Sequence, residues 1–453
     1  MNDPEKQSNR VHVGEADEEE FPEGGKGWLV LLGCGLTSIF VFGMINSYGV
    51  FQTHYETVLF PNVSSSKLSI IGATQASLCY FLTPWTVPLV HAFGLRQVLS
   101  VGASFLIISF FGLATTTPSQ LWKCYIFQGL FFSIGAALQF GPAMTVPSEW
   151  FKKKRGTAFG ISAGFVGVGG VVWPILFKQM INKHGFKWTV LTIAFVYIPL
   201  SVGSILLVPQ HLEDRYNHKG KCFSNAVWNN ENIKNLPQSF KNILIEWSHV
   251  IKNPRYSIIL LANLLVSFGS YPVIFYIDFF GHTIGGEAKI VSYLTMIFVV
   301  MGFPGRAIPA MIADKIGRIN VLIVCSAVLF ISIFALWIPS IQYNLLGVYI
   351  GFVIVFGFAV GPLFSLFPAS LGQLFGIRGN EARLSLFLFS ATPGPILGCL
   401  IAGSFIPIDS TDTEKIVHSF YKVVIFSGII LTVCTVLLTG VRLSISRKPF
   451  VFI

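Results

Sequence analysis

One arginine occupies a position where a charged side chain is costly. Arg306 lies inside an apolar run over residues 288–313, eight residues before Asp314. At about 1.5 Å of rise per residue, a helix would place it roughly 12 Å inside the membrane edge. A guanidinium at that depth requires water or a partner, and its forked donors fit carboxylate, phosphate or imide groups. We expect it to bind an anionic substrate; the alternatives are a stem that extends to the membrane surface or pairing with backbone carbonyls.

Two further ionisable residues stand at the end of another apolar run, over residues 256–281. Asp278 and His282 follow Tyr271 and Tyr276. An acid and an imidazole at the outer end of a membrane helix could exchange a proton with the outer solution, so they are our candidates for proton coupling. The alternative is that they mark the boundary between membrane and water, beside an aromatic belt.

Uncharged polar side chains also occur within the apolar runs. In a membrane such groups line a cavity or form hydrogen bonds between helices, and both interpretations stay open. If they line a cavity, we expect them to bind substrate and give specificity around the arginine. They are Asn46, Tyr48, Gln128, Gln139, Asn263 and Ser267.

The composition shows what kind of protein carries these residues. Of the 453 residues, 53% are hydrophobic and only 11% are charged, whereas a soluble domain carries about a quarter of its residues as charges. The mean hydropathy is +0.67, so the chain is a membrane protein that crosses the bilayer repeatedly. The net charge of +10 arises largely from cations in short loops, which explains it without nucleic acid as a partner.

Several kinds of chemistry lack their motifs in this sequence. The seven cysteines show no disulfide or metal-ligand spacing. A nucleotide-binding loop, a zinc-protease motif and a supported Ser–His–Asp grouping are all missing. We therefore expect no metal, no cofactor, no enzymatic activity and no pumping driven by ATP.

Twelve apolar runs are each long enough to cross about 30 Å of hydrocarbon as a helix. They predict an all-α membrane protein with twelve transmembrane helices in two six-helix bundles, over residues 26–208 and 256–440. Residues 1–25 are polar and acidic, and we expect a disordered cytosolic tail. Residues 209–255 form a hydrophilic cytoplasmic linker with room for a short surface helix, and residues 441–453 form a cytosolic tail.

A block of cations orients the chain across the membrane. Lys152, Lys153, Lys154 and Arg155 stand between two apolar runs, which is typical of a cytoplasmic face. With both termini in the cytosol, the sequon at Asn62 lies outside and is a candidate glycosylation site. After the block, small residues recur every three or four positions, which favours close packing against another helix.

The two halves of the chain repeat two landmarks. Gly94 and Gly317 each follow the second helix of a half, and they are 223 residues apart. The Arg155-Gly156 and Arg378-Gly379 pairs follow the fourth helix of each half with the same offset. A shared offset indicates a duplicated six-helix unit with parallel topology. In such repeats the substrate path runs between the halves, which rock to alternate access.

Several short motifs match a known group of transporters. Residues 313–318, Ala-Asp-Lys-Ile-Gly-Arg, are similar to the cytoplasmic gating motif of the major facilitator superfamily. Residues 23–28 and 150–164 resemble the entry motif and the fifth-helix motif of the monocarboxylate transporter family. Residues 46–51 and 305–309 resemble its fungal members. The resemblance covers nearly the whole chain except the tails and the linker.

The resemblance implies roles for several residues and also shows a difference. In the gating motif a carboxylate and an arginine hold the inward gate closed, which assigns Asp314 and Arg318 to the gate, and we add Arg155 of the basic block. In the animal lactate carriers, a lysine and an aspartate act together with the arginine. The matching positions here hold Asn46 and Gly302, so only the arginine of the three remains.

These observations favour a secondary transporter in a plasma membrane, ahead of an internal membrane. We expect it to move a small organic anion, or a planar and weakly acidic metabolite, by alternating access, with facilitated diffusion slightly ahead of proton symport. One alternative is a proton-coupled symporter for a monocarboxylate or a riboflavin-like vitamin. An alternative from another class is a membrane sensor that transports nothing. The expected partners are the substrate, membrane lipid and, in a symporter, the proton.

Overall fold

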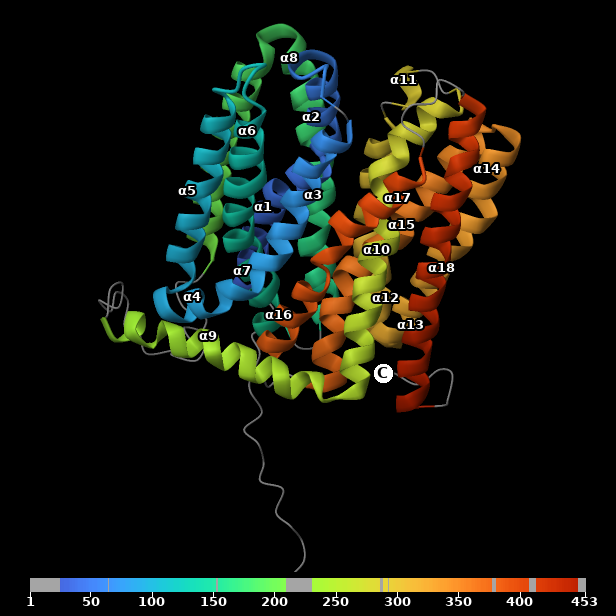
Figure 1. Cartoon of the computed structure of the whole chain (residues 1–453). Helices are drawn as coiled ribbons and strands as arrows, with labels where there is room; N and C mark the ends of the chain where they lie inside the picture. The colour runs from blue at the N-terminus through green and yellow to red at the C-terminus, as the bar shows by residue number, and fades with distance from the viewer. Residues whose placement is uncertain are drawn as a thin grey trace, which may run out of the picture.

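The chain forms two helical bundles that stand side by side, one from each half of the sequence (Figure 1). The computed structural model describes residues 25–63, 65–151, 154–208, 230–285, 288–291, 293–376, 380–406 and 413–446. Every regular element within these ranges is a helix. The expected all-α fold with two bundles is therefore confirmed. The expected N-terminal tail up to residue 24, linker residues 209–229 and tail residues 447–453 lie outside the described ranges.

The first bundle contains the elements that precede the linker. They are α1 (Lys26–Asn46), α2 (Tyr48–His54), η2 (Tyr55–Leu59), α3 (Ser65–Leu82), η3 (Thr83–Trp85), α4 (Thr86–Phe93), α5 (Leu95–Leu113), α6 (Leu121–Lys123), η4 (Cys124–Phe131), α7 (Phe132–Trp150) and α8 (Arg155–Leu207). The label η marks short segments with π or 3-10 hydrogen bonding, which continue the neighbouring α-helices.

The second bundle follows the linker helix α9 (Asn230–Ile251). Its elements are α10 (Pro254–Thr283), α11 (Ala288–Val291), α12 (Leu294–Ile316), α13 (Arg318–Ser332), η7 (Ile333–Trp337), α14 (Ile338–Tyr343), α15 (Leu346–Phe375), α16 (Asn380–Ser390), η8 (Gly394–Gly398), α17 (Cys399–Ser404) and α18 (Thr413–Ile445). Proline residues begin or interrupt several of these helices because they cannot donate a backbone hydrogen bond.

The helices account for twelve crossings of the membrane. Ten described segments are long and apolar enough to cross it. One of them, Gly160–Leu207, holds two crossings because Gly185, with φ of 73°, reverses the chain at the far end of α8 (Figure 1). The segment 65–93, which comprises α3, η3 and α4, runs along the first bundle as the remaining crossing.

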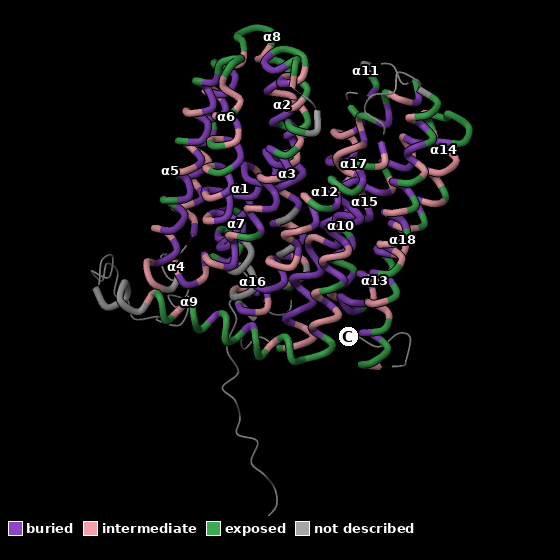
Figure 2. Tube along the Cα trace, viewed as in Figure 1, coloured by how far each residue is buried: buried purple, intermediate pink, exposed green. Residues whose placement is uncertain are grey.

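Burial follows the pattern expected of a protein dissolved in lipid. Figure 2 shows buried residues on the helix sides that face each other and exposed residues around the outside. Many of the exposed residues are large and apolar, such as Leu206, Val324 and Val436. In water such a surface would be a liability, whereas the hydrocarbon of a bilayer solvates it at little cost.

Helix α9 lies across one end of both bundles, the end at which α18 finishes (Figure 1). We call this end the linker face. Trp247 of α9 is buried, and its Nε1 donates a hydrogen bond to Ser385 Oγ of the second bundle at 3.0 Å. The same side chain lies 5.7 Å from the ring of Trp85 in the first bundle, between centroids. The surface helix expected in the linker is thus 22 residues long and contacts both bundles.

Close packing joins the bundles along α8 and α12. A Cβ atom added at Gly160 would lie 2.7 Å from Ala310 Cβ and 2.8 Å from the backbone oxygen of Arg306. At Gly167 the added atom would lie 2.8 Å from Phe303 Cβ. These distances are shorter than any van der Waals contact between carbon atoms, so only glycine allows the two helices to approach this closely. The small-residue pattern in the sequence therefore marks the seam between the bundles.

We expect Gly160→Ala to destabilise the protein by about 1–3 kcal/mol, because the new methyl group meets the backbone of α12 and one helix must move away. The measurement is the thermal unfolding of the purified protein in detergent. Gly351→Ala in α15 is the matched control, since an added Cβ there has no neighbour within 4 Å. Equal melting temperatures for the two variants would contradict the close packing.

Candidate functional site

Arg306 is buried within α12 and lacks a protein partner for two of its nitrogens. The residue is 8% exposed, and within the described residues neither Nε nor Nη1 has a hydrogen-bond acceptor. The Cζ atom lies 5.9 Å from the centre of the Phe364 ring. The side chain neither pairs with backbone carbonyls at these two atoms nor reaches the protein surface. A buried guanidinium with free donors is poised to bind an anion.

Neighbouring glycines fix the backbone of this arginine. A Cβ atom at Gly361 in α15 would lie 2.8 Å from the backbone nitrogen of Arg306, and Gly160 of α8 is equally close to its backbone oxygen. Gly302 lies one helical turn earlier, and an added Cβ there would be 3.5 Å from Nη1. A glycine at this position has no side chain that could offer Nη1 an acceptor.

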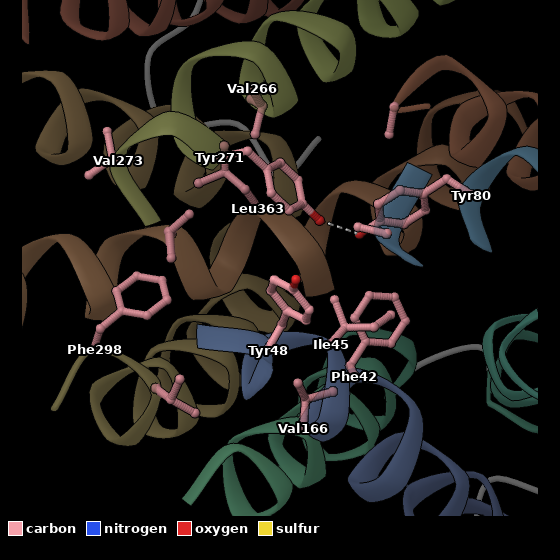
Figure 3. Packing of buried hydrophobic residues seen from close by; sticks show 14 of the residues in the cluster. Phe42, Ile45, Tyr48, Tyr80, Val166, Val266, Tyr271, Val273, Phe298 and Leu363 are labelled. Carbon is pink, nitrogen blue, oxygen red and sulfur yellow. Dashed lines mark hydrogen bonds between the residues drawn. The ribbon is translucent and has the colours of Figure 1, made fainter. Parts of the chain in front are cut away.

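Two tyrosines from opposite bundles meet beside the guanidinium. The hydroxyls of Tyr80 in α3 and Tyr271 in α10 are 3.1 Å apart and share a hydrogen bond (Figure 3). Both phenols interact electrostatically with Arg306. In the sequence Tyr271 served only as a landmark, and Tyr80 was not among the expected site residues. The criterion that selected Tyr48, a tyrosine within an apolar run, applies equally to Tyr80.

Several predicted substrate-binding residues form hydrogen bonds between helices of one bundle. Tyr48 donates from its hydroxyl to the Leu68 carbonyl at 2.5 Å, and Gln139 donates from Nε2 to the Leu99 carbonyl at 2.7 Å. Asn263 donates to the Phe387 carbonyl at 2.7 Å. The geometry supports the interhelical role that the sequence left open as an alternative.

The other predicted polar residues also lie within the bundles. Gln128 accepts a hydrogen bond from the Tyr55 hydroxyl at 2.6 Å. Ser267 donates to the Asn263 carbonyl in its own helix at 3.1 Å. Asn46 is half-buried at the end of α1. Substrate binding by these residues stays a prediction, since Arg306 is the member of the set with free buried donors.

The two candidates for proton coupling lie apart from Arg306, near the start of α12. Asp278 is half-buried, and its Oδ1 accepts a hydrogen bond from the backbone nitrogen of Thr295 at 3.1 Å, which caps that helix. Lys178 of α8 and His282 interact with it electrostatically. The His282 side chain is exposed. Asp278 therefore has a structural role, and a role in proton transfer stays a prediction.

A charged network closes the contact between the bundles at the linker face. Asp314 Oδ1 accepts from Arg318 Nη2 at 2.9 Å and from Nε at 3.1 Å. Its Oδ2 accepts from the backbone nitrogen of Thr157 at 2.7 Å and from Thr157 Oγ1 at 2.8 Å, across the bundle interface. Arg318 Nη1 also donates to the Ala369 carbonyl at 3.2 Å. Thr157 was not among the residues expected from the sequence, because a threonine at the start of a helix does not indicate its partner in another helix.

Two predicted positions are described only in part. Arg155 is the first residue of α8, but its side chain lies outside the described part of the structure. Asn62 is exposed and follows α2, which lies at the end opposite to the linker face (Figure 1). A gating role for Arg155 and a glycan at Asn62 both stay predictions.

Two six-helix bundles with a buried cation near their seam and a charged closure at one end define a multi-pass membrane transporter. The chain belongs to the Major Facilitator Superfamily, which it matches over residues 27–399.

Curated relatives from fungi are similar over most of their length. The MFS transporter asaE of Aspergillus flavus is 30% identical, over 90% of this chain and 85% of that protein. The riboflavin transporter MCH5 of Saccharomyces cerevisiae is 28% identical, over 89% of this chain and 77% of that protein. The fujikurins efflux protein of Gibberella fujikuroi is 27% identical, over 97% of this chain and 87% of that protein.

Solved structures share the fold at low sequence identity. A bacterial homologue of the human drug peptide transporters PepT1 and PepT2 superposes with a TM-score of 0.66 at 15% identity, covering 93% of this chain and 99% of the other. The proton:xylose symporter XylE superposes with a TM-score of 0.62 at 16% identity, covering 91% and 95%. At such identities the likeness concerns the fold alone.

We expect Asp314→Asn to destabilise the closed linker face by about 3 kcal/mol, because the buried Arg318 guanidinium loses its ion partner and an amide cannot replace both accepting oxygens. The measurements are thermal unfolding and the labelling of a cysteine introduced beside Thr157. Glu246→Gln, which removes an exposed carboxylate from α9, is the control. The same melting temperature and labelling rate for Asp314→Asn as for the wild type would rule out this closure.

Proposed function

We propose that this transporter moves a small organic anion, or a planar and weakly acidic metabolite, between the two sides of the membrane, with Arg306 as the anion anchor. The observation that carries the proposal is the burial of Arg306 with Nε and Nη1 free of acceptors among the described residues. An anion is the guest that satisfies two such donors and offsets the cost of burying the charge.

The proposed mechanism is alternating access by rocking of the two bundles. Arg306 lies on α12, the helix whose Phe303 and Ala310 pack against the glycines of α8 in the other bundle. The Asp314 network closes the linker face, so the path would be open from the opposite side. We assign the linker face and both termini to the cytosol and the protein to the plasma membrane, in keeping with the basic block before α8.

The substrate class follows from the chemistry of the site and from two relatives. A bidentate donor suits a carboxylate or an imide, and the surrounding rings suit a planar molecule. Membership of the monocarboxylate transporter family, or transport of a vitamin like riboflavin, would both fit this chemistry. The riboflavin transporter of yeast and the efflux protein for fujikurins lend support to a planar organic substrate.

We expect Arg306→Gln to lower uptake at low substrate concentration by more than about 100-fold, since two charge-assisted hydrogen bonds together contribute about 3 kcal/mol. The measurement is uptake of radiolabelled benzoate and tritiated riboflavin into proteoliposomes, together with an untargeted comparison of metabolites in cells that lack or overproduce the protein. Arg255→Lys, at an exposed arginine near the start of α10, is the control. If Arg306→Gln shifts the same metabolites as the wild type, Arg306 is not the anchor.

We expect uptake to equilibrate the probe across the membrane without accumulation when an inward proton gradient is imposed. The reason is that an arginine stays protonated and a phenol stays neutral near neutral pH, so neither the anchor nor the two phenols would carry a proton through the cycle. Accumulation that follows the gradient, and that a protonophore abolishes, would establish the symporter instead. In that case, loss of accumulation in Asp278→Asn would assign the coupling to Asp278.

A further inference from the structure

The hydrogen bond between Tyr80 and Tyr271 links the two bundles at the place where Arg306 is buried. Tyr80 belongs to α3 of the first bundle and Tyr271 to α10 of the second. Their hydroxyl oxygens are 3.1 Å apart, and both residues are more than nine-tenths buried. Figure 3 shows the two rings directed at each other from opposite sides, with the hydroxyls meeting between them.

The donors and acceptors of this pair leave one proton unused. Two hydroxyls carry two protons, and the bond between them uses only one. Among the described residues, no other hydrogen bond of either hydroxyl is present. The second proton is therefore available to an acceptor. An acceptor that also reaches Arg306 would lie between the pair and the guanidinium, because both phenols are close enough to interact with its charge. An anion bound by Arg306 would occupy this position.

Aromatic rings pack against both tyrosines. The Phe42 ring lies 6.0 Å from that of Tyr80 and 4.4 Å from that of Phe140. On the other side, the Phe275 ring stacks on Tyr271 at 6.1 Å. Flat apolar walls of this kind accommodate a planar molecule with little loss of contact, whereas a branched aliphatic acid would leave gaps.

We infer that Tyr80 and Tyr271 complete the anion site: a planar aromatic carboxylate binds with one carboxylate oxygen toward Arg306 and the other toward the free phenol proton. The inference rests on the proposed function, because it requires Arg306 to be the anchor. It adds that the anion is held by donors from both bundles. The substrate thereby strengthens the link between α3 and α10, which couples occupancy of the site to closure of the bundles around it.

The test compares conservative variants of the full-length purified protein. The variants are Tyr80→Phe, Tyr271→Phe, the double variant and Arg306→Lys. Tyr197→Phe is the matched control, since its buried hydroxyl in α8 has no hydrogen-bond partner in the described structure and lies outside the proposed site. The probe is sodium benzoate, with benzamide as its neutral analogue, and the readout is the rise in melting temperature with probe concentration.

For the double variant we expect the apparent affinity for benzoate to fall about tenfold or more, because a charge-assisted hydrogen bond contributes about 1.5–3 kcal/mol. Each single variant keeps one hydroxyl and should lose less. The weakening should be larger for benzoate than for benzamide, since the neutral amide is the poorer acceptor. Tyr197→Phe should bind both probes as the wild type does.

The outcomes separate this inference from the proposed function. If Arg306→Lys loses benzoate binding while the double tyrosine variant keeps it, the anchor stands and the tyrosines are not part of the site. If Arg306→Lys binds benzoate as the wild type does, or if benzoate at millimolar concentration fails to stabilise the wild type, the anion anchor is refuted and the inference falls with it. An equal loss of benzoate and benzamide in the tyrosine variants would indicate a packing role only.

Discussion

The burial of a guanidinium that the protein leaves partly unsatisfied is the constraint on which the transport site depends. In a bilayer such a group costs several kcal/mol unless it faces water or a counter-charge. Nε and Nη1 of Arg306 have no hydrogen-bond acceptor among the described residues. A chain selected for stability alone would place an acid or an apolar residue here. The protein thus tolerates the cost of the buried charge, and the unpaired donors remain available for an anion.

The surrounding helices keep the arginine in this position. Gly160 of α8 and Gly361 of α15 both contact its backbone, so α12 is held from two sides at the residue that matters for binding. A shift of α12 therefore cannot move the unpaired guanidinium to a more favourable environment. Gly160 also brings the two bundles together, which places the charge beside the seam between them. The candidate anchor and the closest packing between the bundles therefore share one short stretch of helix.

Sequence alone could predict what is local or periodic. The depth of Arg306, the Asp314–Arg318 pair one turn apart and the glycine face of α8 are all legible in the order of residues. Partners across the bundle interface cannot be read from the sequence, because the contacts of Tyr80 and Thr157 are with helices far away in the chain. For the same reason the polar residues within apolar runs could not be sorted beforehand. Asn263, for example, donates a hydrogen bond to the Phe387 carbonyl, and no spacing in the sequence predicts that contact.

The linker helix gives the protein an optical property. Trp247 lies 5.7 Å from Trp85 of one bundle and 5.1 Å from Phe389 of the other, between ring centroids, so two indoles belong to one aromatic cluster at the linker face. Trp247 is buried and Trp85 is half-buried. Separation of the bundles at that face would admit water to this cluster and pull the indoles apart. Their emission would then move to longer wavelength. The chain contains nine tryptophans, so this pair would indicate opening, without any attached dye, once the other seven are replaced.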